Sequence, residues 1–343
     1  MNAKTMDGAR VLVTGGAGFV GSELVRQLCD NKAQVVVVDN LVNGKRENLA
    51  GLPGDQVTLE VADIRDGARM AELMRGIDIV YHLACLCLRH SLHSPLENHE
   101  VNATGTLQVL LAAKEAGVKR FVYTSTGEVY GMPLWTPITE EHGNMPTNAY
   151  GAGKLAGEAY ARAFFVTYHF PAVVIRMFNN YGPRCHHEGD CGEVIPRFLL
   201  RCMAGEPMVI FGDGTQTRDF NYVGDMARGV LMAGLVEEAV GQTFNLGSGM
   251  DISINQLAIE VAKVVGRTEV NVTHDAPRPA DIMQLRADAS KAKKVLGFEA
   301  KVSLQEGLAK LKEWYQSLQK SPKELLGQEI IHNWRKKEVA TNV

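Results

Sequence analysis

A glycine-rich stretch near the start of the chain constrains its fold more than any other feature. Gly15, Gly18 and Gly21 follow the apolar run Arg10–Thr14 (RVLVT) and open a helical pattern over 22–31. Glycine at these positions permits a tight turn, lets backbone N–H groups approach a pyrophosphate, and lets the helix pack closely on the strand. The stretch therefore predicts a strand, a turn and a helix whose N-terminus can hold an anion.

Beyond the glycines, short runs rich in β-branched residues alternate with helical patterns as far as Arg176. The predicted strands are residues 10–14, 34–39, 57–61, 77–83, 120–124 and 172–176, and the predicted helices are 22–31, 101–116 and 148–169. Strands that are apolar throughout and separated by helices indicate a parallel sheet covered on both faces. We therefore expect an α/β fold built on a Rossmann doubly wound parallel sheet.

After Arg176 the elements become shorter and less regular. Residues 179–193 are rich in Gly, Pro, His and Asp and are expected to form a long loop, whereas 244–247 is a further strand. We predict three parts, in this order: a Rossmann domain, 1–176, with 243–250 as a candidate return; a smaller C-terminal α/β substrate lobe, 177–318; and a polar, partly helical tail, 319–343.

Charge and composition argue against several classes of partner. The formal net charge is −3, so no overall positive field attracts nucleic acid or an anionic membrane. No apolar run approaches the ~18 residues of a membrane span, and none near the start has the length of a signal peptide. The six cysteines are dispersed, which favours free thiols over a disulfide framework. We expect a cytoplasmic protein with no nucleic-acid or membrane partner.

Asp39 ends the second predicted strand, 18 residues after Gly21. A carboxylate there can accept hydrogen bonds from the 2′- and 3′-hydroxyls of a ribose and repels a 2′-phosphate, which favours NAD over NADP. The alternative is that Asp39 only caps the loop that follows it. Asp63 and Ile64, after the third strand, are placed to reach the adenine ring, although Asp63 could equally be a solvated loop residue.

Tyr150 and Lys154 are four residues apart on a predicted helix and therefore share one face of it. A phenol with a pKa near ~10 is a poor base at neutral pH. A nearby ammonium, helped by a nicotinamide cation, favours the phenolate, so we expect the pKa of Tyr150 to be lowered. The alternative is an ordinary surface pair.

The segment 125–131 (STGEVYG) follows the predicted strand 120–124, at the carboxyl edge of the sheet where open α/β folds bind ligands. Thr126 could donate a hydrogen bond to an oxygen that is being oxidised, or could instead cap the backbone. Glu128 is a carboxylate available as a second base, with a structural role equally open.

Taken together, the motifs resemble a known family. In chain order they are TGGAGFVGS at 14–22, VDN at 38–40, HLA at 82–84, VNATGT at 101–106, STGEVYG at 125–131, YGAGK at 150–154, RMFNNYG at 176–182, VIFGDGTQTRDFNYVGD at 209–225, FNLGSG at 244–249 and RPADI at 278–282. The chain is similar to the extended short-chain dehydrogenase/reductases, and more narrowly to the nucleotide-sugar epimerase/dehydratase family of UDP-glucose 4-epimerase-like enzymes. The similarity covers roughly residues 10–315.

The resemblance implies a hydride shuttle between bound NAD and C4 of a sugar carried on a nucleotide diphosphate. By matching positions, Tyr150 would be the base, Lys154 would tune it and hold the nicotinamide ribose, and Thr126 would polarise the 4-oxygen. The expected cofactor contacts are Gly15, Gly18, Phe19, Val20, Asp39, Asn40, Asp63, Ile64, Leu83 and Lys154. The expected substrate contacts are Asn179 at the sugar or diphosphate, Arg218 and Arg278 at the diphosphate, and His187 at the sugar or phosphate. Each arginine could instead form an interlobe ion pair.

Three reactions share this apparatus, namely 4-epimerisation, 4,6-dehydration and decarboxylation of a uronic acid. Dehydratases of the family resemble T-D-E, and decarboxylases T-S-E, at the positions held here by Thr126, Gly127 and Glu128. Gly127 has neither a proton to give nor a hydroxyl, which favours an epimerase, whereas Glu128 keeps the other two reactions open. A non-catalytic NAD-binding sensor is a further alternative, although a sensor has no need of a Tyr–Lys pair.

Two further features complete the expectations. The loop 185–191 (CHHEGDC) collects metal-ligand residue types, but its spacing fits zinc sites poorly, so we expect a substrate-covering loop and no metal. Cys85 and Cys87 are expected to line the site near the sugar without taking part in catalysis. The resemblance also implies a homodimer through the helices 101–116 and 148–169, although their apolar stripes could equally face the chain's own sheet.

Overall fold

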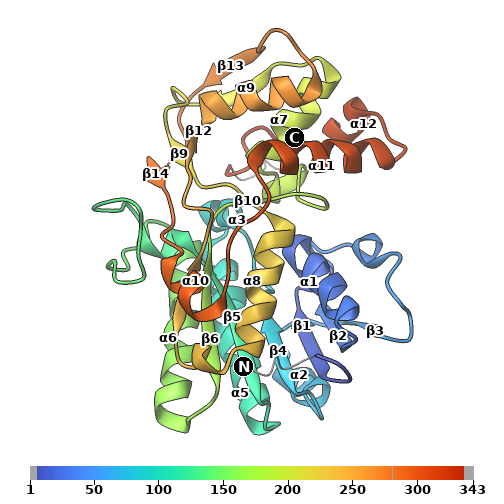
Figure 1. Cartoon of the computed structure of the whole chain (residues 1–343), viewed down its shortest axis with the longest axis vertical. Helices are drawn as coiled ribbons and strands as arrows, with labels where there is room; N and C mark the ends of the chain where they lie inside the picture. The colour runs from blue at the N-terminus through green and yellow to red at the C-terminus, as the bar shows by residue number, and fades with distance from the viewer. Residues whose placement is uncertain (1–5, 280, 336–343) are drawn as a thin grey trace, which may run out of the picture.

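The chain forms a seven-stranded parallel sheet with a smaller lobe at one end (Figure 1). The structure is a computed structural model that describes residues 6–279 and 281–335, so residues 336–343 of the predicted tail lie outside it. The strands of the sheet, in chain order, are β1 Arg10–Thr14, β2 Gln34–Asp39, β3 Val57–Val61, β4 Ile79–His82, β5 Arg120–Thr126, β6 Ala172–Met177 and β11 Thr243–Leu246. The spatial order β11-β6-β5-β4-β1-β2-β3 reverses direction between β1 and β4, which confirms the predicted Rossmann fold.

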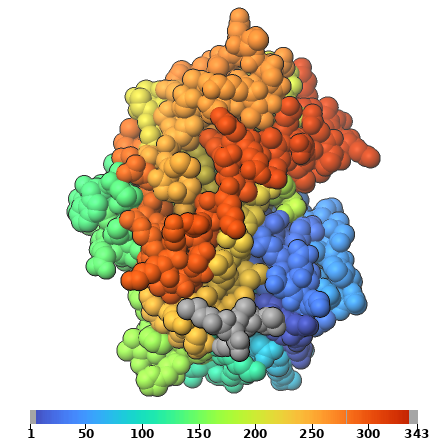
Figure 2. Space-filling view, viewed as in Figure 1, coloured from blue at the N-terminus to red at the C-terminus, as the bar shows by residue number. Residues whose placement is uncertain are grey.

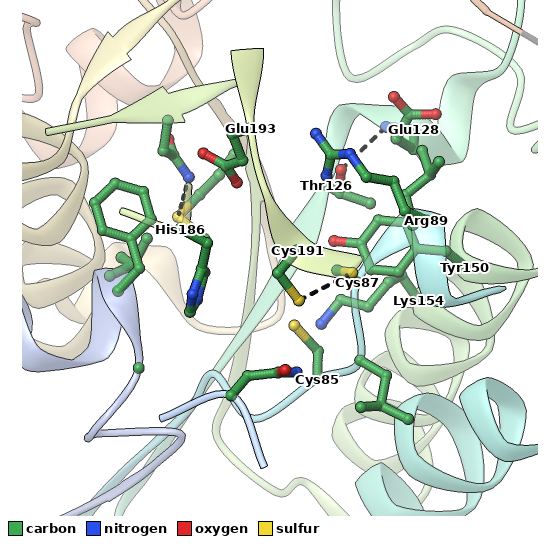
Figure 3. Close-up of a pocket in the computed structure, with 18 of the residues that line it drawn as sticks. Cys85, Cys87, Arg89, Thr126, Glu128, Tyr150, Lys154, His186, Cys191 and Glu193 are labelled. Atoms are coloured by element: carbon green, nitrogen blue, oxygen red, sulfur yellow. Dashed lines mark hydrogen bonds between the residues drawn. The ribbon is translucent and has the colours of Figure 1, made fainter. Parts of the chain in front are cut away.

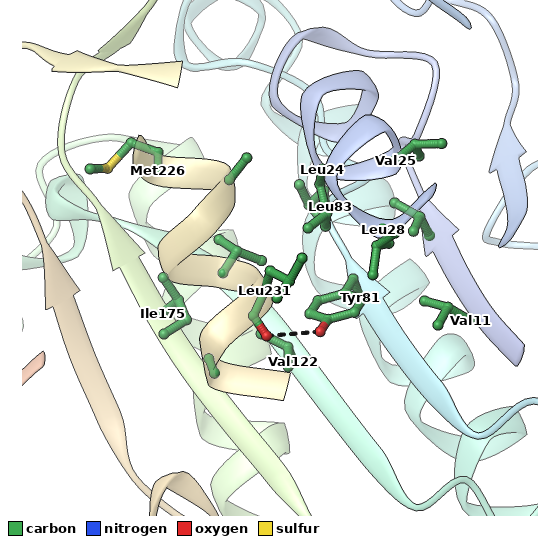
Figure 4. Packing of buried hydrophobic residues seen from close by; sticks show 14 of the residues in the cluster. Val11, Leu24, Val25, Leu28, Tyr81, Leu83, Val122, Ile175, Met226 and Leu231 are labelled. Atoms are coloured by element: carbon green, nitrogen blue, oxygen red, sulfur yellow. Dashed lines mark hydrogen bonds between the residues drawn. The ribbon is translucent and has the colours of Figure 1, made fainter. Parts of the chain in front are cut away.

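Helices cover both faces of this sheet because its strands are apolar on both sides. On one face α1 (Phe19–Asp30) packs beside α8 (Val223–Leu235), and the phenol of Tyr81 donates a hydrogen bond to the Leu231 carbonyl at 3.0 Å (Figure 4). The helices that pack on the other face are α2 Gly67–Leu73, α5 Thr106–Glu115 and α6 Ala149–Tyr168. The two apolar clusters fix the carboxyl ends of the strands, where the ligand crevice of such folds lies.

The first domain includes more segments from the second half of the chain than the stretch 243–250 that was predicted to return to it. The strand β11 pairs with β6 at the edge of the sheet. The helix α8 and the short helix α10 (Ser290–Leu296) also pack into the sheet's core, although both fall in the stretch predicted to form the lobe. The polypeptide therefore crosses between the two parts several times, and Figure 2 shows them closely joined.

The smaller lobe has its own apolar core. Its helices are α7 Val194–Ala204, α9 Ile254–Val265, α11 Leu304–Ser317 and α12 Pro322–Leu326. Its short strands are β8 Met208–Phe211 paired with β13 Val272–Asp275, and β9 Thr217–Arg218 between β12 Ile252–Ser253 and β14 Gln284–Leu285. A further pair, β7 Asn180–Tyr181 and β10 Asn221–Tyr222, lies at the join with the first domain.

The remaining short elements connect these parts. They are the helices α3 Leu88–His93 and α4 Pro95–His99, the π-helical turn Glu100–Gly105, and the 3-10 turns Arg46–Leu49, Gly127–Tyr130, Gly189–Cys191 and Glu237–Ala239. The described part of the predicted tail is not a free appendage. Glu329 pairs with Arg197 and Arg201 of α7, and Asn333 donates to the carbonyls of Asp190 and Gly192 at 3.2 and 3.0 Å.

Candidate active site

One continuous pocket runs from the carboxyl ends of β1 and β4 to the smaller lobe, and Figure 3 shows its middle. The predicted site residues that line it are Gly15, Gly18, Phe19, Val20, Asp39, Asn40, Asp63, Ile64, Leu83, Thr126, Glu128, Tyr150, Lys154, Asn179, Arg218 and Arg278. The fold thus gathers residues that are up to 263 positions apart in the sequence. His187 is the exception among the predicted residues.

The glycine turn allows a ligand to approach the protein backbone closely. Gly15 has φ +70°, and a Cβ there would lie 2.7 Å from the amide nitrogen of Ala84. Any larger residue would therefore clash with the segment after β4. The helix α1 begins directly afterwards with Gly18 as its N-cap, and its first turn carries no acidic residue, so its positive end remains available for a diphosphate.

Asp39 is buried at the end of β2 with its carboxylate in the pocket wall. It accepts hydrogen bonds from the backbone N–H groups of Ala17 at 3.0 Å and of Leu41 at 2.9 Å. Burial raises the pKa of this carboxyl group, and the two backbone hydrogen bonds oppose the rise. Each oxygen keeps a further lone pair that a ribose hydroxyl can use, so the loop-capping role does not exclude the predicted ribose role.

Asp63 lies at the rim of the same end and is held by Arg65. The guanidinium donates to both carboxylate oxygens at 2.9 and 2.7 Å, and Asn40 adds a longer contact at 3.3 Å. These hydrogen bonds lower the pKa of Asp63 to about 2, so it remains a carboxylate acceptor. Ile64 beside it supplies an apolar surface on which an adenine ring can rest.

The catalytic pair predicted from the sequence lies on α6, whose start is fixed by its cap. Asn148 accepts a hydrogen bond from the Gly151 N–H at 2.8 Å, which places Tyr150 and Lys154 on the turn that faces β5. Lys154 is fully buried, and its Nζ lies 4.6 Å from the centre of the Tyr123 ring. Both side chains line the pocket, so they are not an ordinary surface pair.

The expected lowering of the tyrosine pKa depends on a nicotinamide cation beside the phenol, so it stays a prediction. Burial raises the pKa of Tyr150 above its ordinary value, the charges of Cys85 and Glu128 add to this rise, and hydrogen bonding with Thr126 opposes it. Burial likewise lowers the pKa of Lys154. Desolvation is thus the largest influence on the pKa of both side chains.

Thr126, Gly127 and Glu128 form the turn at the end of β5. The Thr126 hydroxyl accepts the Glu128 N–H at 3.2 Å, so the capping role exists alongside its place beside Tyr150. Glu128 accepts from Asn148 at 3.2 Å, and burial raises its pKa while Arg218 lowers it. A Cβ at Gly127 would lie 3.1 Å from the Phe178 ring, which leaves little space for a side chain.

Two arginines from the lobe face the pocket and share one carboxylate. Asp281 pairs with Arg218 at 2.5 Å and with Arg278 at 3.5 Å. The ion pairs lie within the lobe and not between the lobes, which corrects the alternative considered for these arginines. Two guanidiniums against one carboxylate leave a net positive charge that suits a diphosphate. Burial lowers the pKa of Arg278 to about 10, which still leaves it charged at neutral pH.

His187 does not line the pocket, and His186 takes its place. The His187 ring is buried in the lobe against Tyr315, with 3.3 Å between its Nδ1 and the phenol oxygen, and its Nδ1 also lies 3.1 Å from Glu188. Adjacent residues on this loop point to opposite sides, so residue type alone could not choose between the two histidines. The predicted substrate contact therefore moves to His186.

The pocket residues that sequence reasoning missed include three with large polar or aromatic side chains: Arg89, Glu193 and Trp334. The Nε atom of Arg89 is buried and has no hydrogen-bond partner among the described residues. Burial raises the pKa of Glu193 to about 7. Trp334 packs edge-on against Phe211, with 4.7 Å between ring centres, and a tryptophan within an otherwise polar tail was the available signal.

The cysteine- and histidine-rich loop gathers no metal ligands in the described part of the chain, where no group of three or more suitable side chains could hold an ion. All six cysteines are free. No helix within 6–279 or 281–335 has the length and apolar character needed to cross a membrane.

Comparison with known proteins relates the whole of this architecture to nucleotide-sugar enzymes. A family model described as GDP-mannose 4,6 dehydratase matches residues 12–311. The UDP-glucose 4-epimerase of Mycolicibacterium smegmatis is 36% identical over 90% of this chain and 99% of its own length. UDP-glucuronic acid decarboxylase 1 of Arabidopsis thaliana is 37% identical over 88% of this chain and 68% of its own length. Nearly equal identities to two different activities mean that identity does not select the reaction.

Solved structures give the same result for the fold. The UDP-glucose 4-epimerase of Thermotoga maritima, crystallised with UDP-glucose, has a TM-score of 0.85 and 34% identity, and the match covers 91% of this chain and all of that one. The dTDP-glucose 4,6-dehydratase DesIV of Streptomyces venezuelae, crystallised with NAD, has a TM-score of 0.85 and 32% identity, with 90% and 97% covered.

Proposed function

Because the chain belongs to the extended short-chain dehydrogenase/reductase family of nucleotide-sugar epimerases and dehydratases, we propose that it is an NAD-dependent 4-epimerase of a nucleotide-diphosphate sugar. The cofactor is NAD, since Asp39 offers a carboxylate to the ribose hydroxyls and a 2′-phosphate would meet its charge. The glycine turn and the start of α1 hold the diphosphate, while Asn40, Asp63, Ile64 and Leu83 surround the rest of the cofactor.

The crowding at Gly127 is the observation that supports an epimerase over its relatives. Dehydration needs an acid near the departing C6 hydroxyl, and the family resemblance places that acid at position 127. The three atoms nearest to a Cβ there all belong to the Phe178 ring, at 3.1 to 3.2 Å, so an aspartate would displace the ring. A site without this acid can oxidise C4 and reduce it again, but it lacks the group that dehydration uses.

In this proposal the reaction begins with the proton of the sugar 4-hydroxyl. The Tyr150 phenolate oxygen takes that proton, and the hydrogen bond from Thr126 steadies the sugar oxygen that becomes a carbonyl. Bound NAD would supply the hydride acceptor and donor for C4, and inversion requires that the hydride return to the opposite face of the sugar. Lys154 lies on the same helical face. Its ammonium, together with a bound positive nicotinamide, would oppose the effect of burial, which raises the pKa of Tyr150.

The substrate is gripped from the lobe side. Arg218 and Arg278, held together by Asp281, bind the diphosphate, and Asn179 and His186 lie where they can contact the sugar or its phosphates. Because the two arginines bind the diphosphate, which does not react, their contacts leave the sugar free to turn over between the two hydride transfers.

A second candidate, 4,6-dehydration or decarboxylation of a uronic acid, is favoured by Glu128. This carboxyl group is buried beside Tyr150, and its raised pKa suits a group that takes and gives a proton. A simple epimerase has no evident use for it. Glu128 therefore keeps the elimination reactions as the alternative.

Incubation with a panel of nucleotide sugars tests the proposal. NMR and mass spectrometry of the products are expected to reveal unchanged mass with inverted configuration at C4. A product lighter by one water would make the protein a dehydratase, and a product lighter by carbon dioxide would make it a decarboxylase. Binding of NAD with no turnover on any member of the panel would favour the sensor.

We also propose a homodimer formed by α5 and α6. The outer side of α6 carries exposed small apolar residues at helical spacing, Ala152, Ala159, Ala163 and Val166, and Leu111 of α5 is exposed on the neighbouring helix. Small side chains allow a second pair of helices to approach closely. Sedimentation analysis is expected to give twice the chain mass, and Ala159→Arg is expected to give the monomer. A monomeric wild-type protein would contradict the proposal.

A further inference from the structure

Two cysteine thiols meet in the wall of the pocket although 104 residues separate them in the sequence. Cys87 is the N-cap of α3, and Cys191 ends the 3-10 turn Gly189–Cys191. Their sulfur atoms lie 3.1 Å apart, and the Cys87 thiol is also within 3.7 Å of the Asp190 carbonyl oxygen. Figure 3 shows the pair between Tyr150 and Lys154 on one side and His186 and Glu193 on the other.

The surroundings make the two thiols unequal. The Cys191 thiol donates a hydrogen bond to Cys87, and the Arg89 charge, the His90 backbone N–H and His186 also favour the Cys87 thiolate, whereas burial opposes it. The pKa of Cys87 is thereby lowered, while that of Cys191 is raised well above the ordinary thiol value. These opposite shifts make Cys87 the better nucleophile of the pair and leave Cys191 as the neighbouring thiol that holds its proton.

The elements that carry the two thiols are also held by contacts of neighbouring residues. His93 of α3 pairs with Asp190 at 3.0 Å, which ties the helix to the turn. Asn333 holds the carbonyls of Asp190 and Gly192, and the Gly189 N–H donates to the Gln328 carbonyl at 3.1 Å. The thiols therefore lie on two elements that are each held in place by other contacts.

We propose that Cys87 and Cys191 form a peroxide-responsive modification site in the wall of the substrate pocket, in which oxidation joins α3 to the 3-10 turn through a reversible disulfide. The proposal goes beyond the 4-epimerase assignment, and only its effect on turnover rests on that assignment.

The chemistry needs a peroxide as oxidant. The Cys87 thiolate attacks one peroxide oxygen, the O–O bond breaks, and the leaving oxygen departs as alkoxide or hydroxide that takes a proton from water. Cys87 is then a sulfenic acid. The Cys191 sulfur attacks it, the S–O bond breaks, and the Cys191 proton leaves with the oxygen as water. The two thiols lose two electrons in total, and the peroxide gains them.

Disulfide formation would alter the pocket where the sugar is held. The sulfur atoms must approach from 3.1 Å to the disulfide length of about 2.05 Å. Both residues line the pocket, and so do their neighbours Arg89 and Glu193. A shift of about 1 Å in groups that position a substrate can cost about 100-fold in rate, so we expect oxidation to reduce turnover by about 10- to 100-fold.

Mass spectrometry and thiol titration of the NAD-loaded protein test the chemistry directly. After treatment with a small excess of hydrogen peroxide, we expect a mass lower by two hydrogens, a peptide that links Cys87 to Cys191, and recovery of both thiols with dithiothreitol. Free thiols at both positions after treatment would overturn the proposal. So would a crosslink that joins either residue to a different cysteine.

Two variants separate the roles of the thiols, with the ratio of oxidised to untreated activity as the readout for each. Cys191→Ser lacks the resolving thiol, so peroxide is expected to drive Cys87 to the sulfinic acid, which dithiothreitol does not reverse. Cys87→Ser is expected to keep its activity through the same treatment. Cys202→Ser, in α7 away from the pocket, should respond as the wild type does. Identical behaviour of the three variants would refute the assigned roles.

The two proposals fail in distinguishable ways. A protein that forms the disulfide but has no activity on any nucleotide sugar would refute the 4-epimerase and leave the modification site standing. An active 4-epimerase whose turnover is unchanged by a fully formed disulfide would refute the effect of the modification on the pocket.

Discussion

The two ends of the pocket are built in different ways. The cofactor end comes from consecutive strand–helix units, and its polar contacts are local, such as those from Ala17 and Leu41 to Asp39. The sugar end is assembled from distant segments, with Cys87 and Arg89 from the region of α3, Cys191 from the 3-10 turn Gly189–Cys191, and Trp334 from the C-terminal stretch. A local motif can therefore fix a cofactor site, whereas the sugar site depends on how several loops are braced.

The ends also differ in how their charged groups are satisfied. At the cofactor end each carboxylate has backbone or guanidinium partners, and Asp63 stays ionised because of Arg65. At the sugar end, burial dominates, and the pKa of Glu193 rises to about 7 while the Nε of Arg89 lacks a partner within the described residues. Such unsatisfied groups are typical of a site that completes its contacts with a substrate.

The largest effect is expected at the junction of the two ends. Tyr150→Phe removes the oxygen that takes the substrate proton, so we expect kcat to fall by about 10³- to 10⁴-fold with NAD still bound. Steady-state rates and the NAD content of the purified variant check this. Tyr160→Phe on the same helix, outside the pocket, is the control and should keep its activity. Unchanged turnover in Tyr150→Phe would contradict the proposed mechanism.

At the cofactor end, Asp39→Asn should weaken NAD binding by about 10- to 100-fold, because hydrogen bonds to a charged group contribute about 1.5–3 kcal/mol. The change also removes the repulsion of a 2′-phosphate, so the preference for NAD over NADP should shrink. Calorimetric titration of both cofactors measures this. Asp30→Asn at the exposed end of α1 is the control. An unaltered preference would mean that Asp39 only caps its loop.

At the far wall, Trp334→Ala should raise KM for the nucleotide sugar by roughly 3- to 10-fold with little change in kcat, since an aromatic contact contributes about 0.5–1.5 kcal/mol. Initial rates over a range of substrate concentrations separate the two constants. Trp135→Ala, exposed and outside the pocket, is the control. A fall in kcat at constant KM would place Trp334 in the positioning of the reacting sugar, which would weaken the contrast between the two ends.

The smallest effect concerns stability. In the folded chain the pKa of Glu193 is raised to about 7, whereas in the unfolded chain Glu193 has its ordinary, lower pKa. Between these two pKa values the folded chain holds a proton that the unfolded chain has released. The free energy of unfolding therefore falls as the pH rises through this range. Glu193→Gln should therefore be more stable than the wild type at pH ~8, by on the order of 1 kcal/mol or roughly 2 °C in Tm, and equal to it near pH ~4. Thermal unfolding at both pH values tests this.

Glu188→Gln, near Glu193 in the sequence, is expected to change the stability at neutral pH in the opposite direction. Burial raises the pKa of Glu188, but hydrogen bonds with His186 and Lys45 outweigh it and hold the pKa below the ordinary value. The wild-type group therefore stabilises the fold at neutral pH and loses that contribution on acidification. The glutamine variant should be the less stable one at neutral pH, and a gain in stability there would contradict the sign.

The sequence predicted the sheet because each strand and its period are local properties. It also identified the glycine turn, Asp39 and the Tyr150–Lys154 pair, since these spacings place side chains within one or two elements. The sequence could not distinguish His186 from His187, because the direction of the His187 side chain depends on its contact with Tyr315 of α11. The pairing of Cys87 with Cys191 and the place of Trp334 required the tertiary fold.

The position of Trp334 has a consequence for synthesis of the chain on the ribosome. The segments that carry Gly15 and Asp39 are made before the lobe, and domains tend to fold as they are made. The wall that includes Trp334 is completed only after residues 40–333 have been translated. A nascent chain therefore acquires its two halves of the pocket in a fixed temporal order, with the sugar half last.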